Sequence, residues 1–201
     1  MKFILASASR SRKALLKEIG FVPNICMSTD INETPKKKEK PRLLAIRLAK
    51  EKSLAAMEKI KDKSDIVVLS ADTVVAVGSR IIDKALNNED IYKNMKMLSG
   101  RNHRVFSGFN IVQTNKDGDI IRTIAKVVTT RVKFKSLSDI DIRDLIASNT
   151  GIGVAGGYTI NNFGASFAIS IIGSHTNIMG LPLYQVRNSL LTIGLKSVLT
   201  G

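Results

Sequence analysis

Apolar and polar positions change their period repeatedly along the chain, and each change predicts a new strand or helix. Apolar runs of strand composition occupy residues 3–6, 21–29, 66–78, 103–114, 120–135 and 166–173. Helical spacing begins near Ser9 or Ser11 and recurs at residues 41–60, 88–98, 138–148 and 182–195. Because strands and helices alternate without a linker or an internal repeat, we predict one α/β domain over residues 1–201, with a mixed twisted sheet flanked by helices.

Two segments carry clear local signals. Asp117-Gly118, between the runs at 103–114 and 120–135, is a favoured turn for a β-hairpin. In the helix predicted for 41–60, the apolar side chains fall roughly on one face, which we expect to face the core: Leu43, Leu44, Ile46, Leu48, Ala49, Leu54, Ala55 and Met57. Most lysines of this helix would then be solvated.

The first strand-to-helix junction, "FILASASRSRKALLKEIG", brings small hydroxyl side chains and arginines together. A helix that begins near Ser9 or Ser11 would aim unpaired backbone N–H groups and Arg12 at one point, where a phosphate could bind. The alternative is an ordinary helix cap, with Leu15 and its neighbours Ala14 and Ile19 facing the core. The spacing lacks the full P-loop pattern, so both interpretations stay open.

Composition limits the chemistry that the chain can perform. Cys26 is the single cysteine, and His103 and His175 are the only histidines, which excludes an internal disulfide and a structural zinc site of the usual type. A metal would therefore need oxygen ligands. No apolar run approaches the roughly 20 residues that span a bilayer, so we expect a cytoplasmic protein without a membrane partner.

The formal charge of +14 could attract nucleic acid, a membrane surface or a small polyanionic substrate. Aromatic residues make up 5% of the chain and do not interleave with basic residues. This argues against a stacking platform for single-stranded nucleic acid.

A carboxylate inside an apolar run is the strongest chemical signal. Asp72 lies within "VVLSADTVVAV", and a buried carboxylate is costly unless it is paired, hydrogen-bonded or bound to a cation. Alternatively, Asp72 lies at a strand end and caps a turn. Glu33 in "INETP" is a second acidic candidate, and the candidate cations are Arg12, Lys52 and Lys84. Each of these charges is also compatible with an ordinary solvated position.

Several familiar motifs are absent or lack their context. "GIGVAG" at residues 151–156 has the spacing of a dinucleotide-binding loop, but a helical segment precedes it and "YTI" follows it. The sequence contains no G-x-S-x-G elbow, no H-E-x-x-H pair and no full Walker sequence. Serine hydrolase, zincin and P-loop activities therefore have no support.

A series of short segments occurs in a characteristic order and spacing: "LASAS" with its downstream arginine, "NET", "RLAKEKS", "VLSADTVVAVGSRIIDK", "MLSGRNHRVFSG", "AGGYTI" and "GSHTNIMGLPL". In these segments the chain resembles the Maf family of nucleoside triphosphate pyrophosphatases, structural relatives of the inosine triphosphate pyrophosphatases. The resemblance runs nearly from end to end.

The resemblance implies a two-lobed architecture with a central cleft. It also implies hydrolysis of a nucleoside triphosphate to the monophosphate and pyrophosphate, with Mg²⁺ or Mn²⁺, in the control of a nucleotide pool. Asp72 would accept the proton and share a metal site with Glu33, and Lys84 would complete the catalytic set. The implied substrate-binding positions are Ser7, Ser9, Ser11, Arg12, Lys52, Thr73 and Asn161. We also expect a homodimer and no stable nucleic-acid partner.

Two regions depart from the family pattern. The family turn often reads S-x-S-P-R-R, whereas Ser11 stands here at the first arginine position. Asn161 and Asn162 replace a glutamine or glutamate and the following glycine. Since the family associates these positions with base selection, we predict a broad base preference. Two alternative functions remain: a nucleic-acid-binding regulator of division, and a pseudo-enzyme that binds nucleotide without turnover.

Overall fold

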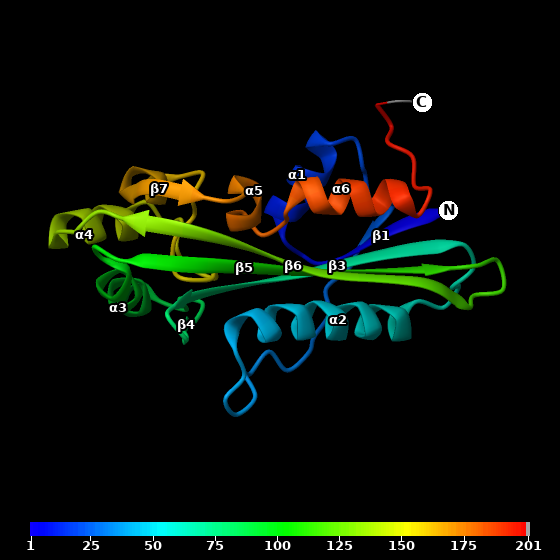
Figure 1. Ribbon diagram of the computed structural model, residues 1–201, viewed down its shortest axis with the longest axis horizontal. Coiled ribbons are helices and arrows are strands. Elements are labelled where there is room, and N and C mark those ends of the chain that lie inside the picture. The colour runs from blue at the N-terminus through cyan, green and yellow to red at the C-terminus, as the bar shows by residue number, and fades with distance from the viewer. Residues whose placement is uncertain (200–201) are drawn as a thin grey trace.

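The computed structural model describes residues 1–199 and shows a seven-stranded mixed sheet with helices on both faces (Figure 1). The order across the sheet is β2-β1-β3-β5-β6-β7, and β4 pairs with β3 outside this path. The strands are β1 (Lys2–Ala6), β2 (Ile25–Cys26), β3 (Ile66–Val77), β4 (Arg80–Ile82), β5 (Asn102–Thr114), β6 (Ile120–Phe134) and β7 (Ala168–Ile172). The predicted fold class, a mixed sheet flanked by helices, is confirmed.

Parallel and antiparallel pairing divide the sheet. β1 is parallel to both β2 and β3, whereas β3, β5, β6 and β7 are successively antiparallel. The hairpin of β5 and β6 turns where Asp117-Gly118 predicted it, and Gly118 has φ +87°, a value that glycine adopts without strain. The long strands β3, β5 and β6 run the length of the molecule and form the centre of the sheet (Figure 1).

Helices cover the two faces unequally. They are α1 (Arg10–Glu18), α2 (Pro41–Lys59), α3 (Asn88–Leu98), α4 (Asp139–Ala147), α5 (His175–Ile178) and α6 (Leu183–Thr192), and Phe163–Phe167 forms a 3₁₀ helix. In Figure 1, α2 lies below the sheet, and α1 and α6 lie above it. None of the helices within residues 1–199 has the length and hydropathy needed to cross a membrane.

Two large apolar clusters form on the sheet, beside two smaller ones. In one, Leu15 of α1 and Leu190 of α6 pack with Phe109 of β5. In the other, α3 and α4 pack with β5 and β6 around Phe134. The partly buried Met179 packs against both clusters, so the segment that carries it lies between them.

Helix α2 approaches the sheet unusually closely. A Cβ atom at Gly108 of β5 would lie 2.4 Å from the carbonyl oxygen of Ala45, a distance that real Cβ atoms do not show. The Ser70 hydroxyl of β3 donates a hydrogen bond of 2.6 Å to the carbonyl oxygen of Ala49. Because Gly108 is paired with Asp72, this close approach occurs beside the candidate carboxylate.

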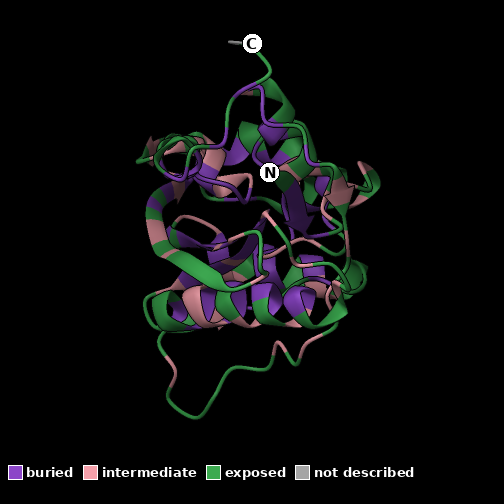
Figure 2. Ribbon diagram, turned by 90° about the vertical axis from the view of Figure 1, so that its right-hand side faces the viewer, coloured by how far each residue is buried: buried purple, intermediate pink, exposed green. Residues whose placement is uncertain are grey.

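Some details of the sequence interpretation are wrong. The run at 21–29 contributes only the two residues of β2. On α2, Leu43 and Leu54 are each 55% exposed, although both were expected in the core, whereas Lys52 is only 8% exposed. The buried face of α2, seen in Figure 2, is lined by small and polar side chains as well as leucines, because the helix lies so close to the sheet. Ala14 of α1 is also exposed.

Candidate active site

A cavity of about 570 Å³ opens between the β1–α1 turn, the middle of β3, the segment 153–162 and residues 178–180. A volume in this range is typical of small-molecule sites. All the predicted site residues line this cavity except Ser7 and Glu33, and each of these two accepts a hydrogen bond from a residue that does. The fold therefore brings together side chains that are far apart in the sequence.

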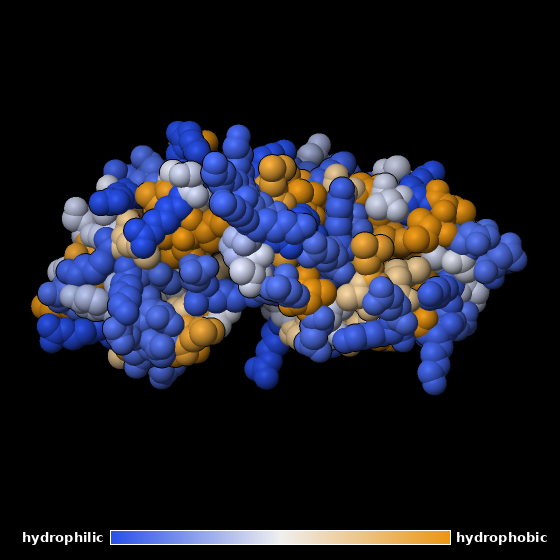
Figure 3. Space-filling model, turned by 90° about the horizontal axis from the view of Figure 1, so that it is seen from below, coloured by the Kyte–Doolittle hydropathy of each residue, from blue (hydrophilic) through white to orange (hydrophobic). Residues whose placement is uncertain are grey.

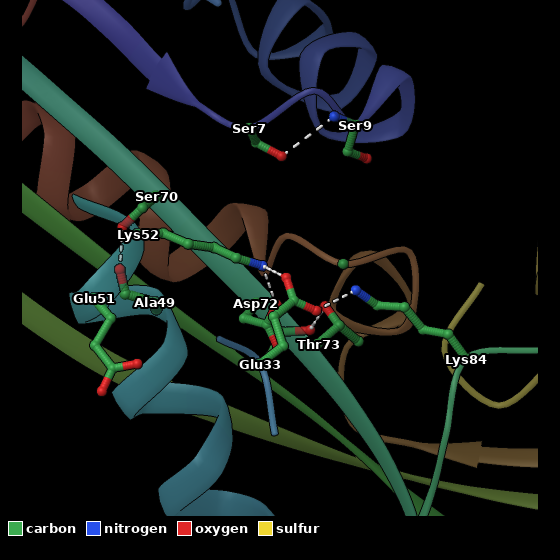
Figure 4. A network of polar contacts seen from close by, with 12 residues as sticks. Ser7, Ser9, Glu33, Ala49, Glu51, Lys52, Ser70, Asp72, Thr73 and Lys84 are labelled. Carbon is green, nitrogen blue, oxygen red and sulfur yellow. Dashed lines mark hydrogen bonds and ion pairs between the residues drawn. The ribbon is translucent and has the colours of Figure 1, made fainter. Parts of the chain in front are cut away.

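Asp72 lies in the middle of β3, not at a strand end, and is 4% exposed. Its Oδ1 atom accepts a hydrogen bond of 2.5 Å from Nζ of Lys52, which reaches across from α2 (Figure 4). Within residues 1–199 no side chain donates to Oδ2 of Asp72. The buried carboxylate is thus paired on one oxygen and free on the other, which leaves Oδ2 available to a water or a cation.

Glu33 joins the same network from the loop between β2 and α2. Its Oε1 atom lies 2.6 Å from Nζ of Lys52, and its Oε2 atom accepts a hydrogen bond of 2.5 Å from Nζ of Lys84. Partial burial alone would raise the pKa of Glu33, but the hydrogen bonds and charges of Lys52 and Lys84 lower that pKa to about 2. Glu33 is therefore ionised at neutral pH. Figure 4 shows the alternating order of acidic and basic groups.

All three nitrogen atoms of the Arg12 guanidinium group donate hydrogen bonds. Nη1 donates to Oγ of Ser7 at 3.1 Å, Nη2 donates to Oγ1 of Thr73 at 3.3 Å, and Nε donates to the carbonyl oxygen of Gly180 at 3.0 Å. Gly180 has φ +100°, so a side chain at this position would be strained. Burial lowers the pKa of Arg12, while the charges of Asp72 and Glu33 oppose that shift. Arg12 is thus a fixed cation in the cavity wall.

The serine-rich turn is both a helix cap and part of the cavity wall. Ser9 is the N-cap of α1, and its hydroxyl accepts a hydrogen bond from the backbone N–H of Arg12. Ser7 accepts a hydrogen bond from the backbone N–H of Ser9 (Figure 4). Ser11 donates to the carbonyl oxygen of Met179 at 3.1 Å. The two interpretations of this junction are therefore compatible, because a capped helix N-terminus also faces the cavity.

One part of the cavity wall, here called the apolar end, is formed by Val75, Val105 and Tyr158, which all belong to the second apolar cluster. The Tyr158 hydroxyl and Nε2 of His103 are 2.7 Å apart and hydrogen-bonded. Burial lowers the pKa of His103 to about 4 and raises the pKa of the Tyr158 hydroxyl above its usual value. Both groups are therefore neutral at neutral pH. Asn161, which follows Ile160 of the same cluster, also lines the cavity.

A divalent cation fits the oxygen donors of Glu33 and Asp72, which converge on Nζ of Lys52. Among residues 1–199, however, no group of three or more acidic, histidine or cysteine side chains could hold a metal alone. Mg²⁺ commonly uses one or two carboxylates and completes its coordination with water and substrate phosphates. The residues present therefore suit a cation that arrives with a phosphorylated ligand.

Sequence reasoning missed part of the cavity wall. The carbonyl oxygens of Met179 and Gly180 hold Ser11 and Arg12, and Tyr158 forms the apolar wall. The segments "GSHTNIMGLPL" and "AGGYTI" had supported the family resemblance, but they had no assigned role in the site. The 151–156 glycine segment opens no helix, as predicted, yet residues 153–155 line the cavity.

Comparisons with known proteins find similarity over nearly the whole chain. The family model described as "Maf-like protein" matches residues 2–193. A protein named nucleoside triphosphate pyrophosphatase from Rickettsia akari (strain Hartford) is 41% identical over 196 residues, which cover 98% of this chain and 96% of the relative. One of the same name from Rickettsia felis (strain ATCC VR-1525 / URRWXCal2) is also 41% identical over 196 residues, covering 98% of this chain and 95% of the relative. Among solved structures, the Ham1 protein of Staphylococcus aureus is similar in fold, with a TM-score of 0.51 and 13% identity, over 96% of this chain and 100% of that chain.

Proposed function

This chain belongs to the family of Maf-like proteins, and we propose that it is an enzyme that hydrolyses nucleoside triphosphates to the monophosphate and pyrophosphate. The observation that carries the proposal is the network of Asp72, Lys52, Glu33 and Lys84 at the wall of one cavity. Acidic and basic side chains alternate in this network, and each forms an ion pair with the next. A triphosphate and a cation together present the complementary set of charges.

Asp72 is the proposed proton acceptor. Its Oδ2 atom faces no donor within residues 1–199, whereas its Oδ1 atom is fixed by Lys52. A carboxylate held on one oxygen can accept a proton from a water with the other, and this water would attack the α-phosphorus. The proton passes to Asp72 as the bond between the α-phosphorus and the bridging oxygen breaks, and pyrophosphate leaves.

The cations supply the binding of the triphosphate. Arg12 is anchored by hydrogen bonds to Ser7, Thr73 and Gly180, so it presents a positive charge in a fixed place. Lys84 is 44% exposed at its side chain, so it can turn from Glu33 towards a phosphate oxygen at small cost. Ser9 and Ser11 contribute the capped helix N-terminus, where backbone N–H groups favour an anion.

We propose Mg²⁺ or Mn²⁺ as the cofactor, held by Glu33 and Asp72. Such an ion would neutralise phosphate charge and polarise the phosphorus towards attack. In this arrangement Glu33 and Asp72 would exchange part of their contact with Lys52 for the ion, which would release Lys52 to the phosphate chain. A role in nucleotide-pool control belongs to the same proposal.

The test is product analysis with a panel of canonical, methylated and deaminated nucleoside triphosphates in the presence of Mg²⁺ or Mn²⁺. We expect equal amounts of monophosphate and pyrophosphate. Release of inorganic phosphate and a diphosphate would contradict cleavage at the α-phosphorus. DNA affinity that falls steeply with salt, without hydrolysis, would support the regulator suggested by the charge of +14. Nucleotide binding without turnover would support the pseudo-enzyme.

We also propose a homodimer, a cytoplasmic location and no stable nucleic-acid partner. β7 pairs with β6 only at residues 131–134 and 168–172, so within residues 1–199 no strand covers β6 from Ile121 to Thr129 on that side. A free edge of this length can pair with a second chain. Sedimentation equilibrium would test the dimer, and a monomer at micromolar concentration would contradict it.

A further inference from the structure

Glu33 depends on contacts that substrate binding would disturb. Its carboxylate is ion-paired with Lys52 and Lys84, and within residues 1–199 it has no other ion pair. Under the proposed function, both lysines turn towards phosphate oxygens when the triphosphate binds. Glu33 would then be held at the cavity by the proposed ion and by the contacts that fix its loop.

Arg47 of α2 makes contacts that can do this. Its Nη2 atom donates a hydrogen bond of 3.1 Å to the carbonyl oxygen of Thr34, the residue next to Glu33. Nε and Nη2 also donate to the two carboxylate oxygens of Glu39, at 2.7 and 2.8 Å. Nη1 donates to Oε2 of Glu51 at 2.8 Å. One guanidinium group thus joins α2 to the loop that carries Glu33 at two points, Thr34 and Glu39.

Glu39 extends this connection into the tip of the loop. Its Oε2 atom accepts a hydrogen bond of 2.9 Å from the backbone N–H of Lys36, and its own backbone N–H donates to the carbonyl oxygen of Lys36 at 2.9 Å. The side chains of Arg47 and Glu39 are only 16% and 9% exposed. Solvent therefore screens this pair less than an ordinary surface ion pair, and its two parallel hydrogen bonds fix its geometry.

Helix α2 carries both Arg47 and Lys52, the lysine that is ion-paired with Glu33. Lys52 follows Glu51 directly, and Glu51 is bonded to Arg47. The space-filling view from the α2 side shows hydrophilic residues interrupted by several apolar patches (Figure 3). Residues 32–39, NETPKKKE, carry no large apolar side chain that could hold the loop by packing. Ile31, at its start, packs against Leu44 and its neighbours. Beyond Ile31, polar contacts hold the loop.

We propose that Arg47 is a positioning residue that keeps the Glu33 carboxylate at the site while Lys52 and Lys84 engage the triphosphate. The inference rests on the proposed function for its consequence in catalysis. Its structural part does not depend on activity, because it concerns the loop from residue 32 to residue 39. Arg47 does not touch the reacting atoms itself.

The variants are Arg47→Met, which keeps the apolar stem, and Arg47→Lys, which keeps the charge but loses the fork. The matched control is Lys50→Met on the same helix. Lys50 is exposed, and its side chain has no ion pair within residues 1–199. Circular dichroism and melting temperature establish that each variant is folded.

Limited trypsin digestion reads the loop directly, because Lys36, Lys37 and Lys38 lie in it. We expect cleavage after these lysines to be at least ~10-fold faster in Arg47→Met than in the wild type, and intermediate in Arg47→Lys. Lys50→Met should match the wild type. Equal cleavage of the wild type and Arg47→Met, with both folded, would overturn the inference.

Kinetic measurements test whether the loss of Arg47 impairs the role of Glu33 in turnover. In Arg47→Met we expect the Mg²⁺ concentration for half-maximal turnover to rise at least ~5-fold, and kcat/KM to fall by ~10-fold or more. In a Glu33→Gln background the same change should alter kcat/KM by less than ~2-fold, because the group that Arg47 positions is gone. Additive losses in the double variant would overturn the positioning role.

The two proposals fail in different ways. A wild type that releases no pyrophosphate defeats the proposed function, and the trypsin assay still decides whether Arg47 holds the loop. An active wild type with unchanged Mg²⁺ dependence in Arg47→Met defeats the inference and leaves the proposed function standing.

Discussion

At the charged end of the cavity, Lys52 and Arg12 each bind groups from more than one segment, whereas Asn161 at the apolar end binds none within residues 1–199. Lys52 joins α2 to β3 and to the Glu33 loop. Arg12 joins α1 to β3 and to Gly180. The polar groups of the charged end are therefore held in place before any ligand arrives.

The apolar end is held by packing instead. Tyr158 packs edge-to-face against Phe134 and His103, and its hydroxyl is bonded to His103. The polar side chains of Thr159, Asn161 and Asn162 also line the cavity. Under the proposed function, the fixed charges would receive the phosphate chain, and the apolar end would pack against the base.

The largest effect should come from Asp72→Asn. The change keeps the size of the side chain but removes the proton acceptor and one negative charge, so we expect turnover to fall at least ~10²-fold. Pyrophosphate release measures turnover, and calorimetric titration with a slowly hydrolysed analogue measures binding, which should be largely kept. Turnover within a few-fold of the wild type would remove Asp72 from the mechanism.

A second experiment compares cations inside and outside the network. Arg12→Ala and Lys84→Ala should each lower kcat/KM by ~10-fold or more, because each removes a charge placed at the cavity. Lys37→Ala should change it less than ~2-fold, since Lys37 is exposed and solvent screens its charge. Equal losses in all three variants would indicate a diffuse electrostatic role, as in a nucleic-acid-binding protein.

The apolar end should respond to acid through His103. Its pKa falls from 6.5 to about 4 on folding, so the unfolded chain binds more protons between these values. Stability is therefore complete above pH 6.5 and is lost as the pH falls towards 4. Between pH 7 and pH 5 this group should remove about 2 kcal/mol of unfolding free energy.

The variant His103→Gln keeps a hydrogen-bonding side chain beside Tyr158 but does not titrate. Urea denaturation at pH 7 and pH 5 should show a smaller loss of unfolding free energy for this variant than for the wild type. An identical loss in both proteins would contradict the assignment of the acid sensitivity to His103.

The smallest effect concerns base selection. The Ser11 hydroxyl already donates to the carbonyl oxygen of Met179, and Asn161 has a short side chain, so neither places a strong directional demand on a base. We expect kcat/KM values for dTTP, UTP, CTP, GTP and 7-methyl-GTP to lie close together, and to separate several-fold further in the double variant Ser11→Arg, Asn161→Gln. A wild type that already prefers one nucleotide by more than ~100-fold would sink this idea.

Periodicity predicted the elements whose burial follows a simple pattern. The helix expected at 88–98 is α3, with Ile91, Met95 and Leu98 buried as the spacing indicated. The strand around Asp72 was predicted for the same reason, because a long apolar run in a sheet is buried on both faces. These residues pack against apolar neighbours, and their burial can be predicted without knowing which apolar residues those are.

Periodicity gave the wrong burial where the burial of a side chain depends on a specific partner. Leu54 is apolar but points away from the sheet, whereas Lys52 is charged but buried, since Asp72 and Glu33 lie opposite it. No spacing rule could bring the Glu33 loop to α2, because that contact depends on the three-dimensional path of a polar loop. The gathering of Arg12, Lys52 and Lys84 could be anticipated only from the family resemblance.

Gly108 has no functional group, and yet it sets how far the ammonium group of Lys52 must reach. Because no side chain separates β5 from α2 at this position, the helix backbone lies against the strand beside Asp72. One added methyl group would act as a wedge between helix and strand. In a saturation mutagenesis experiment, position 108 should therefore tolerate as few replacements as the charged residues beside it.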